Sequence, residues 1–115
     1  MLKASRPVFW VKAARKTFER FPAGARERIA QALDIAAEGR MATIAKPMKG
    51  LGSGVFEVAL KYRSDAYRVV YAVQIGEALW VVHSFQKKST TGIKTPKAEV
   101  DIIRSRLKQL KEMHS

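Results

Sequence analysis

The fold of this chain follows largely from Gly54-VFEVALKYRSDAYRVVYAVQIGEALWVVHSFQK-Lys88, where three strand-like segments succeed one another. The segments cover residues 55–63, 67–75 and 79–85. Each is rich in Val, Tyr, Phe or Trp, the side chains that suit a pleated, half-buried surface. The short connections at 64–66 and 76–78 predict antiparallel hairpins.

Helices are predicted on both sides of these strands. Residues 12–20 and 22–38 read as two helices, because Ala25, Ile29, Leu33 and Ala36 in the second recur at helical spacing and Gly39 is placed to end it. Before them, residues 7–11 form an apolar run that is either a first strand or a lead-in. Residues 40–54 are turn-rich and read as a loop.

The C-terminal part begins with a basic loop over residues 86–96 and continues as a helix. Thr95 is the predicted N-cap and Pro96 the first helical residue. The helix carries one apolar stripe, made of Val100, Ile103, Leu107 and Leu110. We therefore expect a single α+β domain over residues 1–115, with two N-terminal helices packed on a three- or four-stranded antiparallel sheet and a closing helix.

The composition points to a polyanionic partner. Twenty-two Lys and Arg oppose ten Asp and Glu, a formal net charge of +12. A charge of this size indicates nucleic acid, ribosome, an acidic protein or an anionic membrane surface. The absence of cysteine excludes disulfides and thiolate metal sites. No apolar run approaches the length of a membrane span or a signal peptide, so we expect a soluble, cytoplasmic protein.

Alternation along the first two strand segments separates two faces of the sheet. The face expected to pack on the helices carries Phe56, Val58, Leu60, Tyr62, Tyr67, Val69, Tyr71, Val73 and Ile75. The opposite face, expected to be exposed, carries Glu57, Lys61, Arg63 and Arg68. Arg68 lies among apolar neighbours and so needs an anionic partner, either a carboxylate such as Glu57 or a ligand phosphate. The third segment is apolar on both sides, so His83 points either into the core or at the basic face.

Several motifs occur together in this order along the chain. They are Lys46-Pro-Met-Lys-Gly-Leu51, Val55-Phe-Glu-Val, Ala66-Tyr-Arg-Val-Val-Tyr71, Val82-His-Ser-Phe-Gln-Lys-Lys-Ser89 and Thr95-Pro96. In this combination the chain resembles the phage-derived HigB-like branch of the RelE/ParE toxin superfamily, from about Val8 to Leu110. The resemblance implies a RelE-like fold and a type II toxin that cleaves mRNA on the ribosome. It also implies a cognate antitoxin of the helix-turn-helix type, with which such toxins often form a heterotetramer.

The resemblance also implies roles for individual residues. Arg68 matches the phosphate-binding arginine, Lys88 or Lys87 the basic residue after the last strand, and Lys61 a basic position on the strand before. RelE-type ribonucleases have lysines where this chain has Glu57 and Ala59, and their C-terminal tyrosine has no clear counterpart here. These departures weaken the case for RelE-like proton transfer and leave phosphate binding untouched.

Cleavage of RNA without a metal needs a base for the 2′-OH, stabilisation of the phosphorane and a proton for the leaving oxygen. Arg68 with Lys87 or Lys88 can stabilise the phosphorane. Glu57 and His83 are the candidate proton carriers, against the alternatives that Glu57 is an ion-pair partner and His83 a satisfied strand histidine. The cations expected to bind RNA phosphates are Lys46, Lys49, Lys61, Arg63 and Lys94. With two histidines and no ligand spacing, we expect neither metal nor cofactor.

Two other functions remain compatible with the residues. A ParE-like toxin would act on a protein target such as DNA gyrase and leave mRNA intact. A non-catalytic RNA- or DNA-binding module derived from a toxin would bind with strong salt dependence but would not be toxic.

Overall fold

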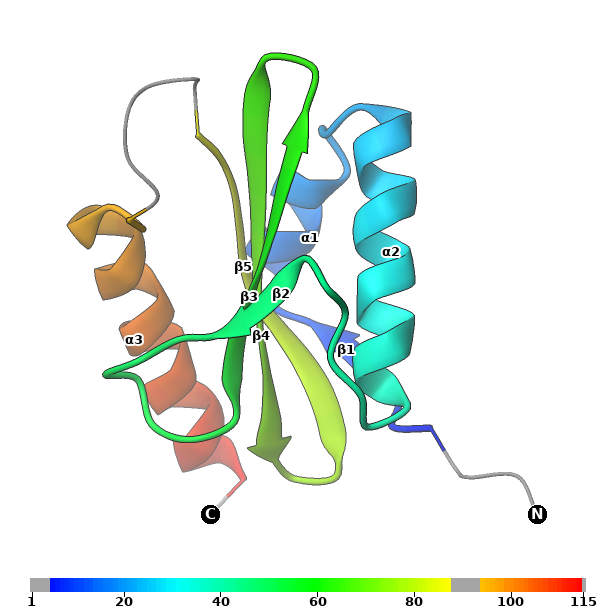
Figure 1. Ribbon diagram of the computed structural model, residues 1–115. Helices are drawn as coiled ribbons and strands as arrows, with labels where there is room; N and C mark the ends of the chain where they lie inside the picture. The colour runs from blue at the N-terminus through cyan, green and yellow to red at the C-terminus, as the bar shows by residue number, and fades with distance from the viewer. Residues whose placement is uncertain (1–4, 88–93, 115) are drawn as a thin grey trace.

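The computed structural model describes residues 5–87 and 94–114, which form a mixed sheet with helices on both of its faces (Figure 1). The strands are β1 (Val8–Trp10), β2 (Ala45–Pro47), β3 (Val55–Tyr62), β4 (Asp65–Ile75) and β5 (Ala78–Lys87), and the helices are α1 (Lys12–Phe18), α2 (Ala23–Ala37) and α3 (Lys97–Met113). The predicted α+β class is confirmed. None of the described helices combines the length and apolarity that crossing a bilayer requires.

The sheet has the strand order β1-β5-β4-β3-β2, with five strands rather than the three or four expected. The additional strand β2 lies inside the predicted loop and pairs antiparallel with β3. Three residues are too few to produce a recognisable alternation, so the sequence pattern does not reveal it. The expectation of a purely antiparallel sheet is also wrong, because β1 pairs with β5 in parallel, with Val8 opposite Leu79.

Both predicted hairpins are present, and they are tighter than expected. Only residues 63 and 64 separate β3 from β4, and only residues 76 and 77 separate β4 from β5. Arg63 and Gly76 have positive φ angles of 58° and 62°, as two-residue hairpin turns require. The short turns fix the register of the three central strands.

One face of the sheet packs against α1 and α2 through apolar side chains. Val58, Val69 and Tyr71 are almost fully buried there against Ile29 of α2 and its neighbours. The apolar face is therefore the one predicted, except for Ile75, which packs on the opposite face of the sheet beyond a shift in register between Ala72 and Ile75. At the start of α2 the approach to the sheet is very close, because a Cβ added at Gly24 would lie 2.2 Å from the Tyr62 hydroxyl.

The middle of the opposite face is covered by α3 and is not the solvated surface that alternation predicted, whereas Lys61 at its margin is exposed as expected (Figure 1). Ile103 and Leu107 of the α3 stripe pack on Val70 and Val82 of the sheet. Val82 joins them because of a shift in register: Val70 pairs with His83 but Tyr71 pairs with Val81. The bulge turns both Val82 and His83 toward α3, which settles the orientation of His83.

Candidate active site beneath the first turn of α3

The register of the sheet places charged residues from three strands side by side on the α3 face. Lys46 of β2 pairs with Glu57 of β3, Glu57 pairs with Val70 of β4, and Val70 pairs with His83 of β5. Residues paired in this way point to the same face of a sheet. Glu57 and His83 thus flank Val70 in one row beneath α3.

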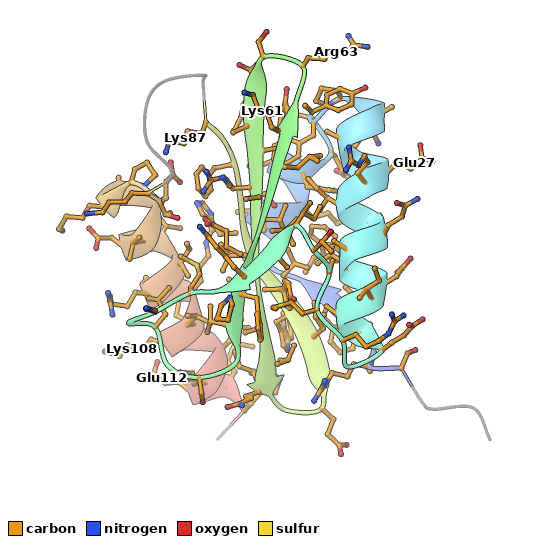
Figure 2. All side chains as sticks on the ribbon, in the orientation of Figure 1. Glu27, Lys61, Arg63, Lys87, Lys108 and Glu112 are labelled. Carbon is orange, nitrogen blue, oxygen red and sulfur yellow. The ribbon has the colours of Figure 1, made fainter. Side chains whose placement is uncertain are left out.

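Two further rows extend this face toward the β3–β4 hairpin. Arg68 lies between Ala59 and Phe85, and beyond it Ala66 lies between Lys61 and Lys87. Lys61 and Lys87 are therefore diagonal neighbours of Arg68, at Cα separations of about 7–8 Å in regular sheet geometry. Both labelled lysines lie near the hairpin end of the sheet in Figure 2. The fold brings together most of the catalytic residues that the sequence indicated; Lys88 lies outside the described residues.

Arg68 and Glu57 form a buried ion pair. Arg68 Nη1 lies 3.1 Å from Glu57 Oε1, and their side chains are 8% and 2% exposed. The prediction that both residues line an exposed basic face is therefore wrong, because Thr95 and α3 cover this part of the sheet. Of the two anionic partners considered for Arg68, the structure contains the carboxylate.

Thr95 also contacts this ion pair. Its hydroxyl donates a 2.7 Å hydrogen bond to Glu57 Oε2. The N-cap of α3 is Pro96, with no capping hydrogen bond from a side chain, so the predicted N-cap role of Thr95 is wrong. A hydroxyl that satisfies a buried carboxylate is worth more here than one that caps a solvent-exposed helix end.

His83 lies between an acidic and a basic side chain of α3. Its Nε2 is 2.6 Å from Glu99 Oε1, and its Nδ1 is 3.0 Å from Arg106 Nη1. Because a guanidinium only donates, Nδ1 accepts from Arg106, and Nε2 carries the hydrogen that is donated to Glu99. Burial lowers the pKa of His83 below its ordinary value of 6.5, and Arg106 lowers it further, while Glu99 opposes both. The imidazole is therefore held neutral and in one tautomer.

Arg106 and Glu99 connect His83 to the interior and to the solvent. Arg106 Nη1 also donates to the Val82 carbonyl at 2.9 Å, and burial lowers the pKa of its guanidinium. The Glu99 side chain is 28% exposed, against 7% for His83. Because Glu99 accepts the hydrogen bond from His83 and is the more exposed of the two, it is the route by which His83 could exchange a proton with solvent.

Glu99 and Arg106 were not predicted from the sequence as site residues. They are seven residues apart, two helical turns, so they share one side of α3. Each also directly precedes a residue of the apolar stripe, Val100 in one case and Leu107 in the other. Charged residues at this spacing beside a buried stripe are the signal that would have indicated them.

The remaining predicted cations divide into those near the site and those away from it. Lys87 Nζ donates to the Lys94 carbonyl at 2.8 Å, which ties the end of β5 to the segment before α3. Lys61 and Lys46 are exposed on the α3 face. Lys49 lies beyond β2 in the connection to β3.

Arg63 is not part of this face. It occupies the β3–β4 turn (Figure 2). Its guanidinium carbon lies 5.4 Å from the centre of the Tyr62 ring. The prediction that it shares a surface with Arg68 is therefore wrong, because the strand ends one residue earlier than alternation suggested. In the described part of the chain, no three His, Cys, Asp or Glu side chains gather as metal ligands would.

The topology is that of the RelE toxin fold. A mutant of the Escherichia coli toxin RelE in the free state superimposes with a TM-score of 0.60 at 18% identity, covering 92% of this chain and 98% of that one. Isolated E. coli RelE gives a TM-score of 0.55 at 18% identity, covering 89% and 98%. At this identity the likeness shows the fold alone.

The chain belongs to the family of the phage-derived protein Gp49-like (DUF891), whose model matches residues 16–108. This range runs from α1 into α3 and includes every candidate active-site residue described above. A search of curated proteins finds no significant match.

Proposed function

We propose that this protein is the toxin of a type II toxin–antitoxin pair and that it cleaves mRNA on the ribosome. The observation that supports the proposal most is the arrangement of the α3 face, where Arg68 lies one row and Glu57 two rows away from Lys61 and Lys87. Lys61 and Lys87 would form a phosphate-binding rim next to the buried residues Glu57 and His83. Metal-independent RNA cleavage needs such a combination of phosphate-binding cations and groups that transfer protons. The RelE fold and the phage-derived family agree with this function.

In the proposed reaction, the RNA 2′-oxygen attacks the adjacent phosphorus and the bond to the 5′-oxygen breaks. Lys61 and Lys87 hold the phosphate, and Arg68 stabilises the extra negative charge of the phosphorane. The proton leaves the 2′-OH for a base and another proton reaches the leaving oxygen, giving a 2′,3′-cyclic phosphate and a 5′-OH. Glu57 and the His83–Glu99 pair are the groups that can accept and deliver these protons.

In this structure Arg68 and Glu57 are closed off from a substrate. Glu57 neutralises Arg68, and the Thr95 hydroxyl covers the carboxylate. A substrate phosphate that takes over Arg68 has to displace Glu57, which then becomes available as a base. We therefore propose that RNA binding at the rim is coupled to the breaking of the Thr95–Glu57 hydrogen bond.

Mapping of RNA 5′ ends after induction in cells tests the proposal. Wild type is expected to produce new ends within mRNA, and Lys87→Ala is expected to reduce their frequency by about 10²–10³-fold, the usual cost of losing one electrostatic donor. Lys12→Ala, an exposed lysine on α1, is the matched control and should leave the ends unchanged. If wild type and Lys87→Ala produced new 5′ ends at the same frequency, Lys87 would have no role in cleavage.

A second candidate function is that of an RNA-binding module that does not cleave. It is favoured by one observation, the neutralisation of Arg68 by Glu57 in a pair that is almost inaccessible to solvent. This candidate predicts salt-dependent RNA binding and no new 5′ ends even from the wild-type protein.

The proposed partner is an antitoxin, expected to be encoded by a small neighbouring reading frame with a helix-turn-helix pattern. Co-expression of the two should suppress growth arrest and yield a heterotetrameric complex that purifies together. Growth arrest that persists with the neighbour present would count against the toxin–antitoxin proposal.

A further inference from the structure

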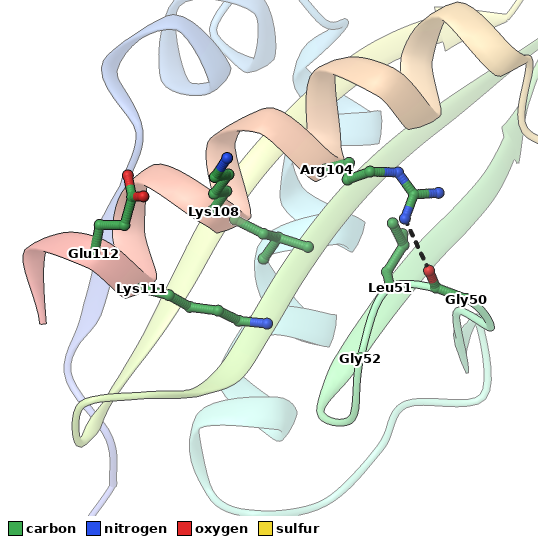
Figure 3. A pocket seen from close by; sticks show the side chains of 8 residues that line it. Gly50, Leu51, Gly52, Arg104, Lys108, Lys111 and Glu112 are labelled. Atoms are coloured by element: carbon green, nitrogen blue, oxygen red, sulfur yellow. Dashed lines mark hydrogen bonds between the residues drawn. The ribbon is translucent and has the colours of Figure 1, made fainter. Parts of the chain in front are cut away.

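A second basic surface lies at the other end of α3. A groove with a volume of about 580 Å³ separates the C-terminal half of α3 from the Gly50–Gly52 turn (Figure 3). Leu51 and Leu107, both nearly buried, are its apolar residues. Its charged residues are Arg104, Lys108, Lys111 and Glu112.

The three cations lie on one side of the helix, since residues four and seven apart occupy neighbouring turns of the same face. Arg104 Nη1 donates to the Gly50 carbonyl at 3.1 Å, which holds the turn against α3. In Figure 3, Arg104 and Lys111 extend from α3 toward the turn on either side of Leu51. Over seven residues the cations span about 10 Å of helix axis.

The backbone of the Gly50–Gly52 turn lies close to the cations of α3. Gly50 and Gly52 have φ angles of 82° and 90°, which other residues rarely adopt. At Gly52 an added Cβ would lie 3.3 Å from Lys111 Nζ, closer than most side chains allow. The Lys111 ammonium group therefore lies directly beside the backbone of the turn.

The charge of the groove is not balanced by the protein. Within the described part of the chain, Lys108 and Lys111 form no ion pair. Three cations against one carboxylate, on a chain of net charge +12, favour a ligand that carries regularly spaced negative charge. The apolar floor suits the ribose and base edges between phosphates.

We infer that this groove binds the sugar–phosphate backbone of single-stranded RNA. From Glu99 to Lys108 the helix rises about 14 Å, so the groove would hold nucleotides other than the one at the candidate active site. The inference rests on the proposed function only in taking RNA as the substrate. Binding itself does not require cleavage.

Binding of a single-stranded 2′-O-methyl oligoribonucleotide, which cannot be cleaved by 2′-OH attack, tests the inference. Fluorescence anisotropy over a series of salt concentrations compares wild type with Lys108→Glu/Lys111→Glu. Losing two phosphate contacts should lower affinity and reduce the slope of log K against log salt by about 1.4, since each contact contributes about 0.7 for single strands. Lys12→Glu/Lys16→Glu, the same charge change on exposed lysines of α1, is the matched control and should give a smaller effect.

Equal slopes for the groove variant and wild type would overturn the inference, whether or not the protein cleaves RNA. So would an oligoglutamate peptide that occupies the groove of wild type in preference to the oligonucleotide, since the ligand would then be an acidic protein segment. Lys108→Ala/Lys111→Ala serves if the charge reversal prevents folding. A groove that binds RNA in a protein that produces no new 5′ ends would leave the inference intact and reject only the proposed cleavage.

Discussion

The two faces of the sheet are buried by different chemistry. Against α1 and α2, Val69 and Tyr71 pack among apolar and aromatic side chains. On the α3 side of the same strand, Arg68 is nearly as buried but is held by the carboxylate of Glu57. Buried ion pairs contribute little net stability, because desolvation offsets their attraction. We interpret the first face as the one that stabilises the fold and the second as one that keeps charged groups for function.

The largest effect is expected from breaking the ion pair on the α3 face. Glu57→Ala leaves Arg68 buried without this carboxylate and should lower the free energy of unfolding by about 3–5 kcal/mol. Urea denaturation measures the change. The double variant Glu57→Leu/Arg68→Met replaces both charges with apolar side chains and should recover most of the stability while remaining inactive in mRNA cleavage. Full activity in a stable double variant would show that the pair has no catalytic role.

A core substitution on the opposite face should be nearly as destabilising, and without an effect that is specific to activity. Ile29→Ala is expected to cost about 2–5 kcal/mol, because it leaves a cavity at a fully buried site. The milder Ile29→Val should cost about 0.5–1.5 kcal/mol. Cleavage per folded molecule, measured below the unfolding temperature, should stay at the wild-type level. A specific loss of activity in Ile29→Val would show that the α1/α2 face contributes to activity as well as to stability.

An intermediate effect is expected from the hydroxyl that covers Glu57. Thr95→Val preserves the side-chain shape and removes the hydrogen bond to the carboxylate, so it should cost about 1.5–3 kcal/mol. Thr43→Val, an exposed position between α2 and β2, is the matched control and should change stability by less than about 0.5 kcal/mol. Equal urea midpoints for the two variants would mean that Thr95 does not support the buried pair.

The smallest effects are expected from pH, and they separate the faces again. His83 on the α3 face has a folded-state pKa below 6.5, so the unfolded chain binds its proton more readily. Stability should therefore fall as the pH drops below about 6.5, by at most about 1.4 kcal/mol per pH unit. His83→Gln should flatten this dependence.

On the α1/α2 face, burial raises the pKa of Tyr71 from 10.0 to about 12. The folded state disfavours its phenolate, so stability should be lost as the pH rises from about 10 toward 12. Absorbance titration of the tyrosines should find Tyr71 ionising last, and Tyr71→Phe should remove that component. A Tyr71 that ionises near pH 10 in the folded protein would contradict its burial.

Local patterns in the sequence were sufficient for the elements that contain enough residues to show a period. The long strands, the two hairpins and the stripe of α3 were predicted from alternation, turn length and helical spacing. The shared face of Glu57, Lys61 and Arg68 also follows from local alternation once the strands pair in register. The ion pair between Glu57 and Arg68 was one of the alternatives that the residues allowed.

Local sequence is enough to say which side chains share a face, because the period of a strand or helix is a property of the local backbone. What covers each face depends on long-range packing: α3 buries the charged one, a bulge turns His83 toward Glu99 and Arg106, and β1 pairs with β5. These contacts join residues far apart along the chain. They depend on which apolar surfaces pack together, and the local periodicity of the sequence does not specify this.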